Sequence, residues 1–342
     1  MNLKDLTEQE RVDIFNEVGK QKHISSQAIE KDWWVSTILE VLFNSQYKDS
    51  IVFKGGTSLS KAWKLISRFS EDIDIAIKRE FLGCGGQLTK NQINNRLRRF
   101  SCSFVRENLR NEVEEGLHSI GIESDSFNVY VDQSPVTTVD PEKIYISYKS
   151  VFEEAPHNSY VKPRVIIEAG ARSISDPFVE VGIQSFISET FPDMPFSRRP
   201  FTVKIVPAER TFLEKAFLLH EEFHKPTSEI RTDRMSRHLY DLEKMMDTPI
   251  AHKAIQDRNL YNKIVTHRKK YIGLKGFDYA SLAPEHINFI PPTTISHHWK
   301  RDYQAMRENI IYGPSIDYET LIKRIRILNV RFNQSTMVIK IE

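Results

Sequence analysis

Two aspartates that lie two residues apart are the clearest candidates for chemistry in this sequence of 342 residues. Asp72 and Asp74 belong to the segment DIDIAI, in which polar or small residues alternate with branched apolar ones. This alternation predicts a half-buried strand over residues 72–77, with both carboxylates on one face. Two such carboxylates can hold divalent cations that bridge nucleotide oxygens and polarise an attacking hydroxyl. The same pair alone is also common on a solvated edge strand, so its neighbours in the sequence matter.

A glycine pair upstream of the aspartates favours phosphate chemistry. Residues 51–53 are an apolar strand candidate, and a turn of small residues follows them. The turn consists of Gly55, Gly56, Thr57 and Ser58. Either hydroxyl residue could cap a helix that extends to about Ser67. Glycines let the backbone approach a ligand, and the N–H groups that open a helix attract anions, so this turn is a candidate triphosphate site.

The periodicity of the remaining segments indicates an α+β fold. Residues 6–46 and 90–120 have helical spacing, and residues 127–181 are rich in strand patterns. Helical patterns dominate again from Pro207 onward, so we expect a domain boundary near residues 200–206. We assign residues 1–205 to the candidate catalytic domain with its N-terminal helices, and residues 206–342 to a helical C-terminal domain.

Composition restricts the class of protein without identifying it. Forty percent apolar and 27% charged residues are ordinary globular values, and two cysteines support neither a disulfide framework nor a cysteine zinc site. No apolar run is long enough for a membrane helix, and the N-terminus is too charged for a signal peptide. We therefore expect a cytoplasmic protein with no membrane partner. A net charge of +2 neither requires nor excludes a nucleic-acid partner.

Local basic stretches leave the question of a nucleic-acid partner open. Residues 96–110 and 258–275 are rich in arginine and lysine, and the second includes Arg268, Lys269 and Lys270. These stretches could line a groove for RNA, with interleaved tyrosines for stacking. They could equally be solvated helix faces.

The sequence resembles the nucleotidyltransferase AbiEii/AbiGii toxin family, within the DNA polymerase β-like nucleotidyltransferase superfamily. Five segments in the family's order carry the resemblance: EKDWW at 30–34, residues 53–77, VPAERTFLEKAFLL at 206–219, RHLYDLEKM at 237–245 and HHWKRDYQAMRENIIYG at 297–313. The resemblance implies a polymerase β-like nucleotidyltransferase domain with a mixed sheet, followed by a mainly helical C-terminal domain. It also implies a toxin of a bacterial toxin–antitoxin or abortive-infection system, a form of phage defence, with a cognate antitoxin encoded nearby.

The resemblance assigns roles to individual residues. Asp72 and Asp74 match the family's metal-binding aspartates, and the turn at residues 55–58 matches its phosphate-cradling turn. Lys215 matches a helical lysine that would offset charge on the triphosphate. Asp241 matches a later aspartate that would contact Lys215, the base or the ribose.

Three further residues have two interpretations each, and Ser70 is a fourth candidate, at the nucleotide-binding site. Glu168, at the end of a strand pattern, is the candidate third metal ligand, or it forms a structural ion pair with Arg164 or Arg172. Lys61 and Arg68 bind phosphates or simply solvate their helix. Ser70 lies where a related toxin family is silenced by antitoxin-kinase phosphorylation, and a phosphate there would repel nucleotide and carboxylates.

These assignments predict a Mg²⁺- or Mn²⁺-dependent nucleotidyltransferase that uses an NTP as substrate. The preferred acceptor is the tRNA 3′ end, because some members of the family add nucleotides there. One alternative is an NTP-binding regulator that does not turn over its nucleotide. Another is nucleotidylation of a protein side chain, which would use the same active-site residues.

A peptidase motif is the main rival. His220-Glu221-Glu222-Phe223-His224 is a literal HExxH, and Glu243 follows at a distance that suits a third zinc ligand. However, Pro226 favours the end of the helix near His224, whereas zinc binding requires both histidines on a firm helix. We therefore expect these histidines to lie at a polar helix end.

Overall fold

The described part of the chain forms two compact units, which we treat separately. The computed structural model describes residues 3–70, 72–132, 141–152 and 161–335. The first unit comprises Met1–Lys64 and Phe69–Val206, and the second comprises Leu65–Arg68 and Pro207–Glu342. Within the described residues, no helix is both long and apolar enough to cross a membrane.

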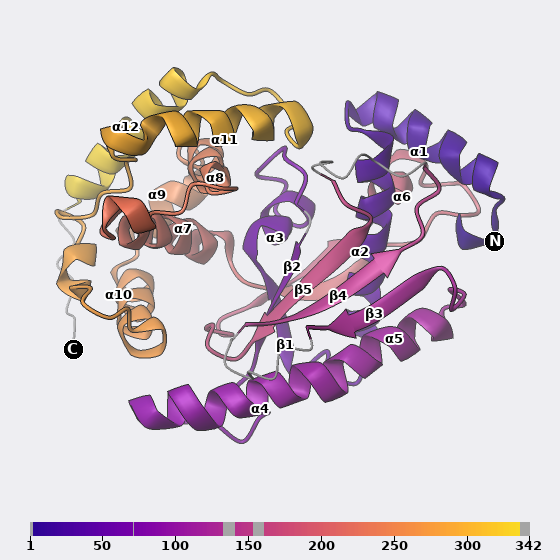
Figure 1. The fold of residues 1–342 in the computed structure, drawn as a ribbon, viewed down its shortest axis with the longest axis horizontal. Helices are drawn as coiled ribbons and strands as arrows, with labels where there is room; N and C mark the ends of the chain where they lie inside the picture. The colour runs from indigo at the N-terminus through magenta and orange to yellow at the C-terminus, as the bar shows by residue number, and fades with distance from the viewer. Residues whose placement is uncertain (1–2, 71, 133–140, 153–160, 336–342) are drawn as a thin grey trace. The chain divides into compact units, whose positions relative to one another are not determined.

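The first unit is built on a seven-stranded mixed sheet with the order β3-β4-β5-β2-β1-β7-β6 (Figure 1). The strands are β1 (Ile51–Lys54), β2 (Asp72–Ile77), β3 (Phe127–Val131), β4 (Glu142–Tyr148), β5 (Arg164–Gly170), β6 (Val179–Ile183) and β7 (Phe201–Ile205). The pairs β1·β7 and β2·β5 are parallel, and the other neighbouring pairs are antiparallel. The α+β class with a mixed sheet, predicted from the sequence, is confirmed.

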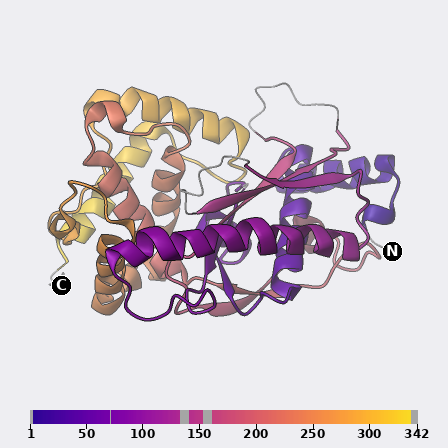
Figure 2. The same ribbon diagram turned by 60° about the horizontal axis from the view of Figure 1, so that its bottom comes forward.

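Helices α2 (Ser26–Asn44) and α5 (Arg110–Ser119) of the first unit pack on one face of this sheet. The other helical segments of the unit are η1 (Leu3–Asp5), α1 (Glu8–Lys22), α3 (Gly55–Lys61), η2 (Gln92–Leu97), α4 (Arg98–Ser103), η3 (Phe104–Leu109) and α6 (Phe186–Thr190). Trp34 of α2 stacks on Tyr148 of β4 with 4.9 Å between ring centroids, and His118 of α5 lies 5.0 Å from Phe127 of β3. The helical segment from η2 to α5 is one long rod (Figure 2).

The opposite face of the sheet carries the predicted aspartates. In β2, Ile73 and Ile75 are 0% and 1% exposed on the helix-covered face, while Asp72 and Asp74 are half-buried on the other. Alternation along a strand places these two pairs on opposite faces. We call the face of β1 to β5 that bears Asp72 and Asp74 the carboxylate face.

Helix α3 is shorter than the sequence pattern indicates. It ends at Lys61, whereas the pattern predicted a helix to about Ser67. Lys64 has a left-handed backbone with φ 54°, and the segment that follows it belongs to the second unit. There the backbone carbonyl of Ser67 accepts the N–H of Tyr312 at 3.0 Å. Pairing with residues distant in the sequence thus replaces the predicted last turns.

The second unit is helical throughout its described part. It contains α7 (Ala208–Phe223), η4 (Thr227–Glu229), α8 (Ser236–Met245), α9 (Pro249–Gln256), α10 (Arg258–His267), η5 (Arg268–Ile272), η6 (Tyr279–Leu282), η7 (Thr293–Ile295), α11 (Ser296–Asn309) and α12 (Tyr318–Asn333). Phe212, Ala216 and Phe217 of α7 are 0% exposed, which places this helix in the core of the unit. The mainly helical C-terminal region is as predicted.

Candidate active site

Strand register brings the candidate metal ligands of the first unit together on the carboxylate face. Asp74 of β2 is the register partner of Glu168 in the parallel strand β5, and Asp72 is the partner of Ile166. Because neighbouring strands lie about 4.8 Å apart, Asp74 and Glu168 are adjacent and Asp72 lies one pleat along the same face. The two aspartates and the candidate third carboxylate are therefore brought together.

A lysine flanks the carboxylates on each side. Lys54 of β1 is the register partner of Asp74, and Lys143 of β4 is the partner of Glu168. The Lys54 ammonium lies 3.8 Å from Asp74 Oδ1, and that of Lys143 lies 2.8 Å from Glu168 Oε1. The hydrogen bond with Glu168 raises the pKa of Lys143, so its ammonium stays protonated at neutral pH. Four strands thus contribute one row of two carboxylates between two cations.

Neither lysine was predicted from the sequence. Lys54 directly precedes the glycine turn, and Lys143 is one of the polar residues that alternate with apolar ones in its strand. Each position gives only a weak indication of a functional residue. Their closeness to the aspartates depends on strand pairing, which local periodicity does not specify.

The glycine turn packs directly against Asp74. Gly55 has φ 79°, a left-handed conformation that residues with a Cβ rarely adopt. A Cβ built at Gly55 would lie 1.9 Å from Asp74 Oδ2 and 2.9 Å from its Cβ. Position 55 therefore requires glycine both for backbone conformation and for the close approach of the turn to a candidate metal ligand.

The hydroxyl groups of the turn are occupied within the protein. Thr57 is 1% exposed, and its hydroxyl donates to the backbone carbonyl of Asp72 and is hydrogen-bonded to the Ser70 hydroxyl at 2.9 Å. Ser58 is 0% exposed and donates to the carbonyl of Gly55 at 2.7 Å. These bonds tie the first turn of α3 to β2, which carries the aspartates.

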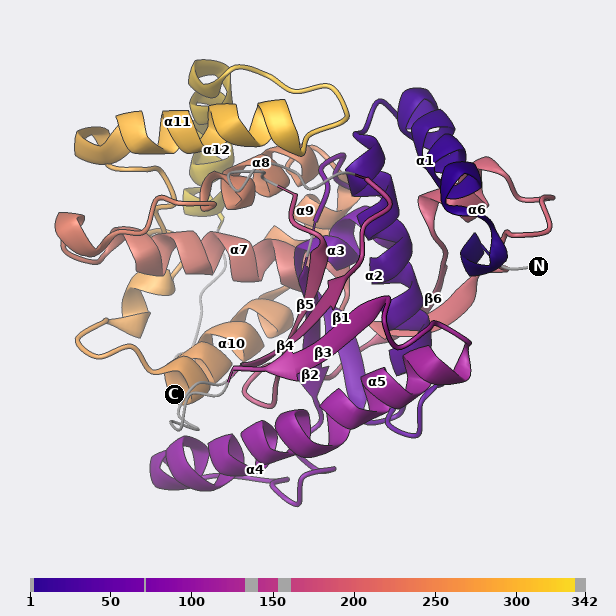
Figure 3. The same cartoon turned by 45° about the vertical axis from the view of Figure 1, so that its right-hand side comes forward.

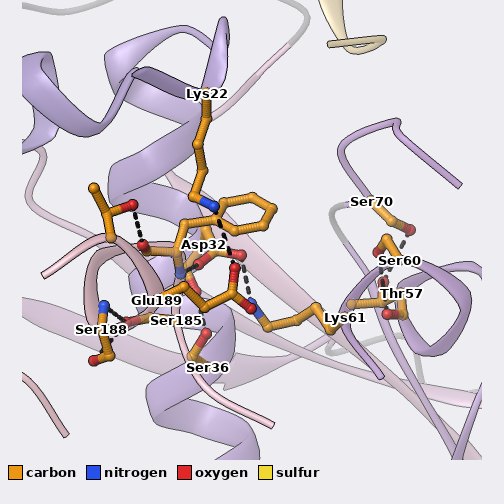
Figure 4. Close-up of polar contacts among 12 residues, drawn as sticks. Lys22, Asp32, Ser36, Thr57, Ser60, Lys61, Ser70, Ser185, Ser188 and Glu189 are labelled. Carbon is orange, nitrogen blue, oxygen red and sulfur yellow. Dashed lines mark hydrogen bonds and ion pairs between the residues drawn. The ribbon is translucent and has the colours of Figure 1, made fainter. Parts of the chain in front are cut away.

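Lys61 lies in a buried ion pair at the other end of α3. Its ammonium contacts Asp32 of α2 at 2.5 Å, and the two side chains are each 4% exposed (Figure 4). The second oxygen of Asp32 accepts the backbone N–H of Phe186 at 2.8 Å, and the Phe186 ring lies 5.1 Å from the Lys61 ammonium. Glu189 nearby binds Lys22 and Lys64. The ion pair fixes α3 to α2.

The second unit gathers the three other charged candidates into one buried cluster. Asp241 is 0% exposed and accepts bonds from Arg68 Nε and Nη2, each at 2.7 Å, and from the Lys215 ammonium at 2.8 Å. Although burial alone would raise the pKa of Asp241, the two cations hold it well below its ordinary value. Burial lowers the pKa of Lys215, which the contact with Asp241 partly offsets. Of the three contacts that the sequence left open for Asp241, the one with Lys215 is present in the structure.

The histidines of the HExxH motif form hydrogen bonds within the second unit. His220 is 0% exposed, with Nε2 3.0 Å from the Ser281 hydroxyl and with Nδ1 accepting the Asn288 backbone N–H at 2.8 Å. Burial, aided by nearby His224, lowers the pKa of His220 to about 3. Helix α7 ends at Phe223, so His224 lies at its C-terminus as the sequence predicted. The expectation of a polar helix end is wrong for His220, because its side chain is buried in the unit.

Comparison with known proteins identifies the family. The family model described as nucleotidyl transferase AbiEii toxin, type IV toxin–antitoxin system, matches residues 37–324, which is most of the chain. The chain belongs to the AbiEii family. It is accordingly a nucleotidyltransferase toxin of a type IV toxin–antitoxin system, and its family implies an antitoxin partner and an NTP substrate. The resemblance found in the sequence is confirmed.

A solved structure of a toxin agrees with this AbiEii fold. The nucleotidyltransferase toxin MenT4 of Mycobacterium tuberculosis H37Rv is 16% identical, with a TM-score of 0.55 over 96% of this chain and 90% of that chain. JHP933 of Helicobacter pylori is 14% identical, with a TM-score of 0.44 over 91% of this chain and 94% of that one. No curated protein matches the sequence. The similarity to MenT4 supports the shared fold.

Proposed function

We propose that this AbiEii toxin transfers a nucleotide from an NTP to an acceptor hydroxyl, with the tRNA 3′ end as acceptor, and that the reaction depends on Mg²⁺ or Mn²⁺. One observation carries the proposal. Asp72, Asp74 and Glu168 share a half-buried face, and the glycine turn at Gly55 packs against Asp74. This is the combination of oxygen ligands and anion-binding backbone that nucleotidyl transfer requires.

The donor set fits a magnesium ion held partly by substrate. In the part of the chain that the structure describes, no three His, Cys, Asp or Glu side chains lie close enough together to hold a metal ion. Mg²⁺ is usually bound by one or two carboxylates and completed by substrate phosphates, so Asp72 and Asp74 suffice, with Glu168 beside them. When bound there, Mg²⁺ supplies positive charge against the phosphate oxygens.

In this proposal the triphosphate binds the backbone of the glycine turn. The hydroxyls of Thr57 and Ser58 are already bonded to protein atoms, and the first N–H groups of a helix have no partner within it. Gly55 and Gly56 bring these N–H groups close to Asp74. Lys61 serves the nucleotide indirectly, since its ion pair with Asp32 holds α3 in place.

The acceptor hydroxyl attacks the α-phosphate in line and a new P–O bond forms. The bond from the α-phosphorus to the bridging oxygen breaks, pyrophosphate leaves, and the hydroxyl proton passes to solvent water. The charges of Lys54 and Lys143 lie on either side of the carboxylates, where they counter the charge of nucleotide and acceptor phosphates. We assign Lys215 and Asp241 to the same reaction because the family motifs match at these positions. Arg68 holds Asp241, so it is a positioning residue in our assignment.

The cellular setting follows from this proposal. A toxin that consumes NTP and modifies tRNA acts in the cytoplasm, and its cognate antitoxin limits it until phage infection. Phosphorylation of Ser70 would break its bond with the Thr57 hydroxyl and place negative charge near Asp72. We propose this as one way in which the toxin could be silenced.

The test is transfer of label from each NTP in turn to total tRNA in the presence of Mg²⁺. We expect label in tRNA with the wild type and none with Asp72→Asn, while Asp193→Asn, which alters an exposed carboxylate, remains active. Chelation with EDTA should abolish transfer, and Mn²⁺ should restore it. Label in protein instead of RNA would refute the tRNA acceptor. NTP binding without any product would refute turnover and favour a regulator.

A further inference from the structure

Two stacked tyrosines extend the carboxylate face beyond the metal ligands. Tyr130 of β3 and Tyr145 of β4 are register partners, and their rings lie 5.2 Å apart with an interplanar angle of 16°. Tyr145 is also the partner of Ile166, which in turn is the partner of Asp72. Tyr130, Tyr145, Ile166 and Asp72 therefore form one row across four adjacent strands, on one face of the sheet. Figure 3 shows the strands β2, β3, β4 and β5 that carry them.

Positive charge accompanies the aromatic pair. The Arg164 guanidinium lies 5.6 Å from the centre of the Tyr145 ring. Lys143, two residues from Tyr145 on β4, places its ammonium against Glu168. Aromatic rings with neighbouring cations are the surface that unpaired nucleotides bind, because bases stack on rings and phosphates meet the charges. Tyr130 remains 38% exposed, so its ring is accessible to a base.

The order of the strands indicates which substrate this surface receives. The glycine turn follows β1, on one side of β2, whereas β5, β4 and β3 lie on the other side. In phosphoryl transfer the attacking and leaving oxygens are roughly in line on opposite sides of the phosphorus. If pyrophosphate leaves toward the glycine turn, the attacking hydroxyl arrives from the side of Tyr145. The tyrosines thus lie on the acceptor side and not on the triphosphate side.

We propose that the surface formed by Tyr130, Tyr145 and Arg164 binds the unpaired 3′ end of the acceptor RNA. Tyr145 and Tyr130 stack on the terminal bases, and Arg164 contacts the backbone beside them. This assignment rests on the proposed function, because it takes Asp72 and Asp74 as the transfer site. It adds that the enzyme recognises a single-stranded end and not the duplex that precedes it.

The first test is RNA binding, which does not require turnover. The probes are a labelled RNA hairpin with a short unpaired 3′ tail and the same hairpin with a blunt end. Tyr145→Thr keeps a strand-forming residue but removes the ring. We expect it to weaken binding of the tailed hairpin about 5- to 100-fold, the effect of losing one base–ring stack. Tyr145→Phe keeps the ring and should bind the tailed hairpin as the wild type does. If the Tyr145 hydroxyl has a purely structural role that binding requires, Tyr145→Phe will bind as weakly as Tyr145→Thr.

A matched control is available in the same unit. Phe81 is 45% exposed and packs edge-on against Phe104, away from the residues assigned here. Phe81→Ala should leave binding of both hairpins unchanged. Arg164→Gln should weaken binding and reduce its dependence on salt. Equal binding of tailed and blunt hairpins, or an equal effect of Phe81→Ala and Tyr145→Thr, would overturn the inference.

Transfer measured on the same variants separates this inference from the proposed function. If Tyr145→Thr raises the KM for tailed RNA and leaves NTP affinity unchanged, both the acceptor surface and the proposed function are supported. If the wild type binds the tail through Tyr145 but transfers no nucleotide, the RNA-binding surface is supported and the proposed function is wrong. If transfer to tRNA is intact in Tyr145→Thr, the proposed function stands and the acceptor surface is wrong.

Discussion

Replacing Gly55 by alanine tests the contact between the glycine turn and Asp74. The left-handed backbone at φ 79° costs an alanine about 1–2 kcal/mol. The added Cβ would also lie 1.9 Å from Asp74 Oδ2. Turning the carboxylate does not remove the overlap, because Asp74 Cβ itself lies 2.9 Å away. The turn or β2 must shift, and a misplacement of roughly 1 Å at a reacting centre costs about 100-fold in rate.

We therefore expect Gly55→Ala to lower transfer about 100-fold, measured as single-turnover label transfer at saturating NTP. Gly83→Ala is the matched control, since Gly83 has φ 65° and nothing lies within 4 Å of a Cβ built there. It should lose about 1–2 kcal/mol in urea unfolding from the backbone conformation alone and keep full transfer. If Gly55→Ala is as active as Gly83→Ala, the close approach of the turn to Asp74 has no role in the reaction and the reasoning fails.

Three further outcomes follow from buried ionisable side chains. Lys61→Met should cost the protein about 3–5 kcal/mol in urea unfolding, because Asp32 is left buried without its cation, and the double variant with Asp32→Asn should recover most of it. If that double variant is stable but has lost NTP affinity, Lys61 contacts the nucleotide directly. The pKa of His220 is about 3 in the folded protein and about 6.5 when unfolded, so the unfolded chain binds more protons below pH 6.5. Acidification from about pH 7 to 5 should thus cost about 2 kcal/mol of stability, and His220→Gln should flatten the dependence of the melting temperature on pH. Arg268→Met should lower the free energy of unfolding by about 3–5 kcal/mol, because it leaves the buried Glu221 carboxylate without its cation. Lys269→Met, at an exposed position, should leave the melting temperature unchanged.

Short-range patterns in the sequence were sufficient for the central features of the fold. Alternation in residues 72–77 predicted the strand and the shared face of Asp72 and Asp74, because the side-chain period of a strand is a local property. The end of helix α7 near His224 followed from Pro226 for the same reason. The family resemblance then supplied the mixed sheet, whose strand order no local pattern contains.

Features that depend on distant pairing were not predicted. Lys143 and Tyr145 join the carboxylate face only through the register of β4 with β5. Arg268 was counted in a basic stretch that could meet RNA, but it is 8% exposed and paired with Glu221. Lys61 finds its partner Asp32 at a separation of 29 residues. For Arg268 and Lys61, a charged side chain was assigned to solvent or ligand because its buried partner lies elsewhere in the chain.

The segment Leu65–Arg68 has a consequence for how this protein can be divided or exchanged. It belongs to the second unit although the chain on both sides of it belongs to the first. A fragment that begins at Pro207 would lack Arg68 and would leave the carboxylate of Asp241 with Lys215 as its remaining cation from the cluster. A single cut therefore does not yield two complete modules. Recombination that replaces the helical unit of this toxin must also carry over four residues that lie in the sequence between the two segments of the first unit.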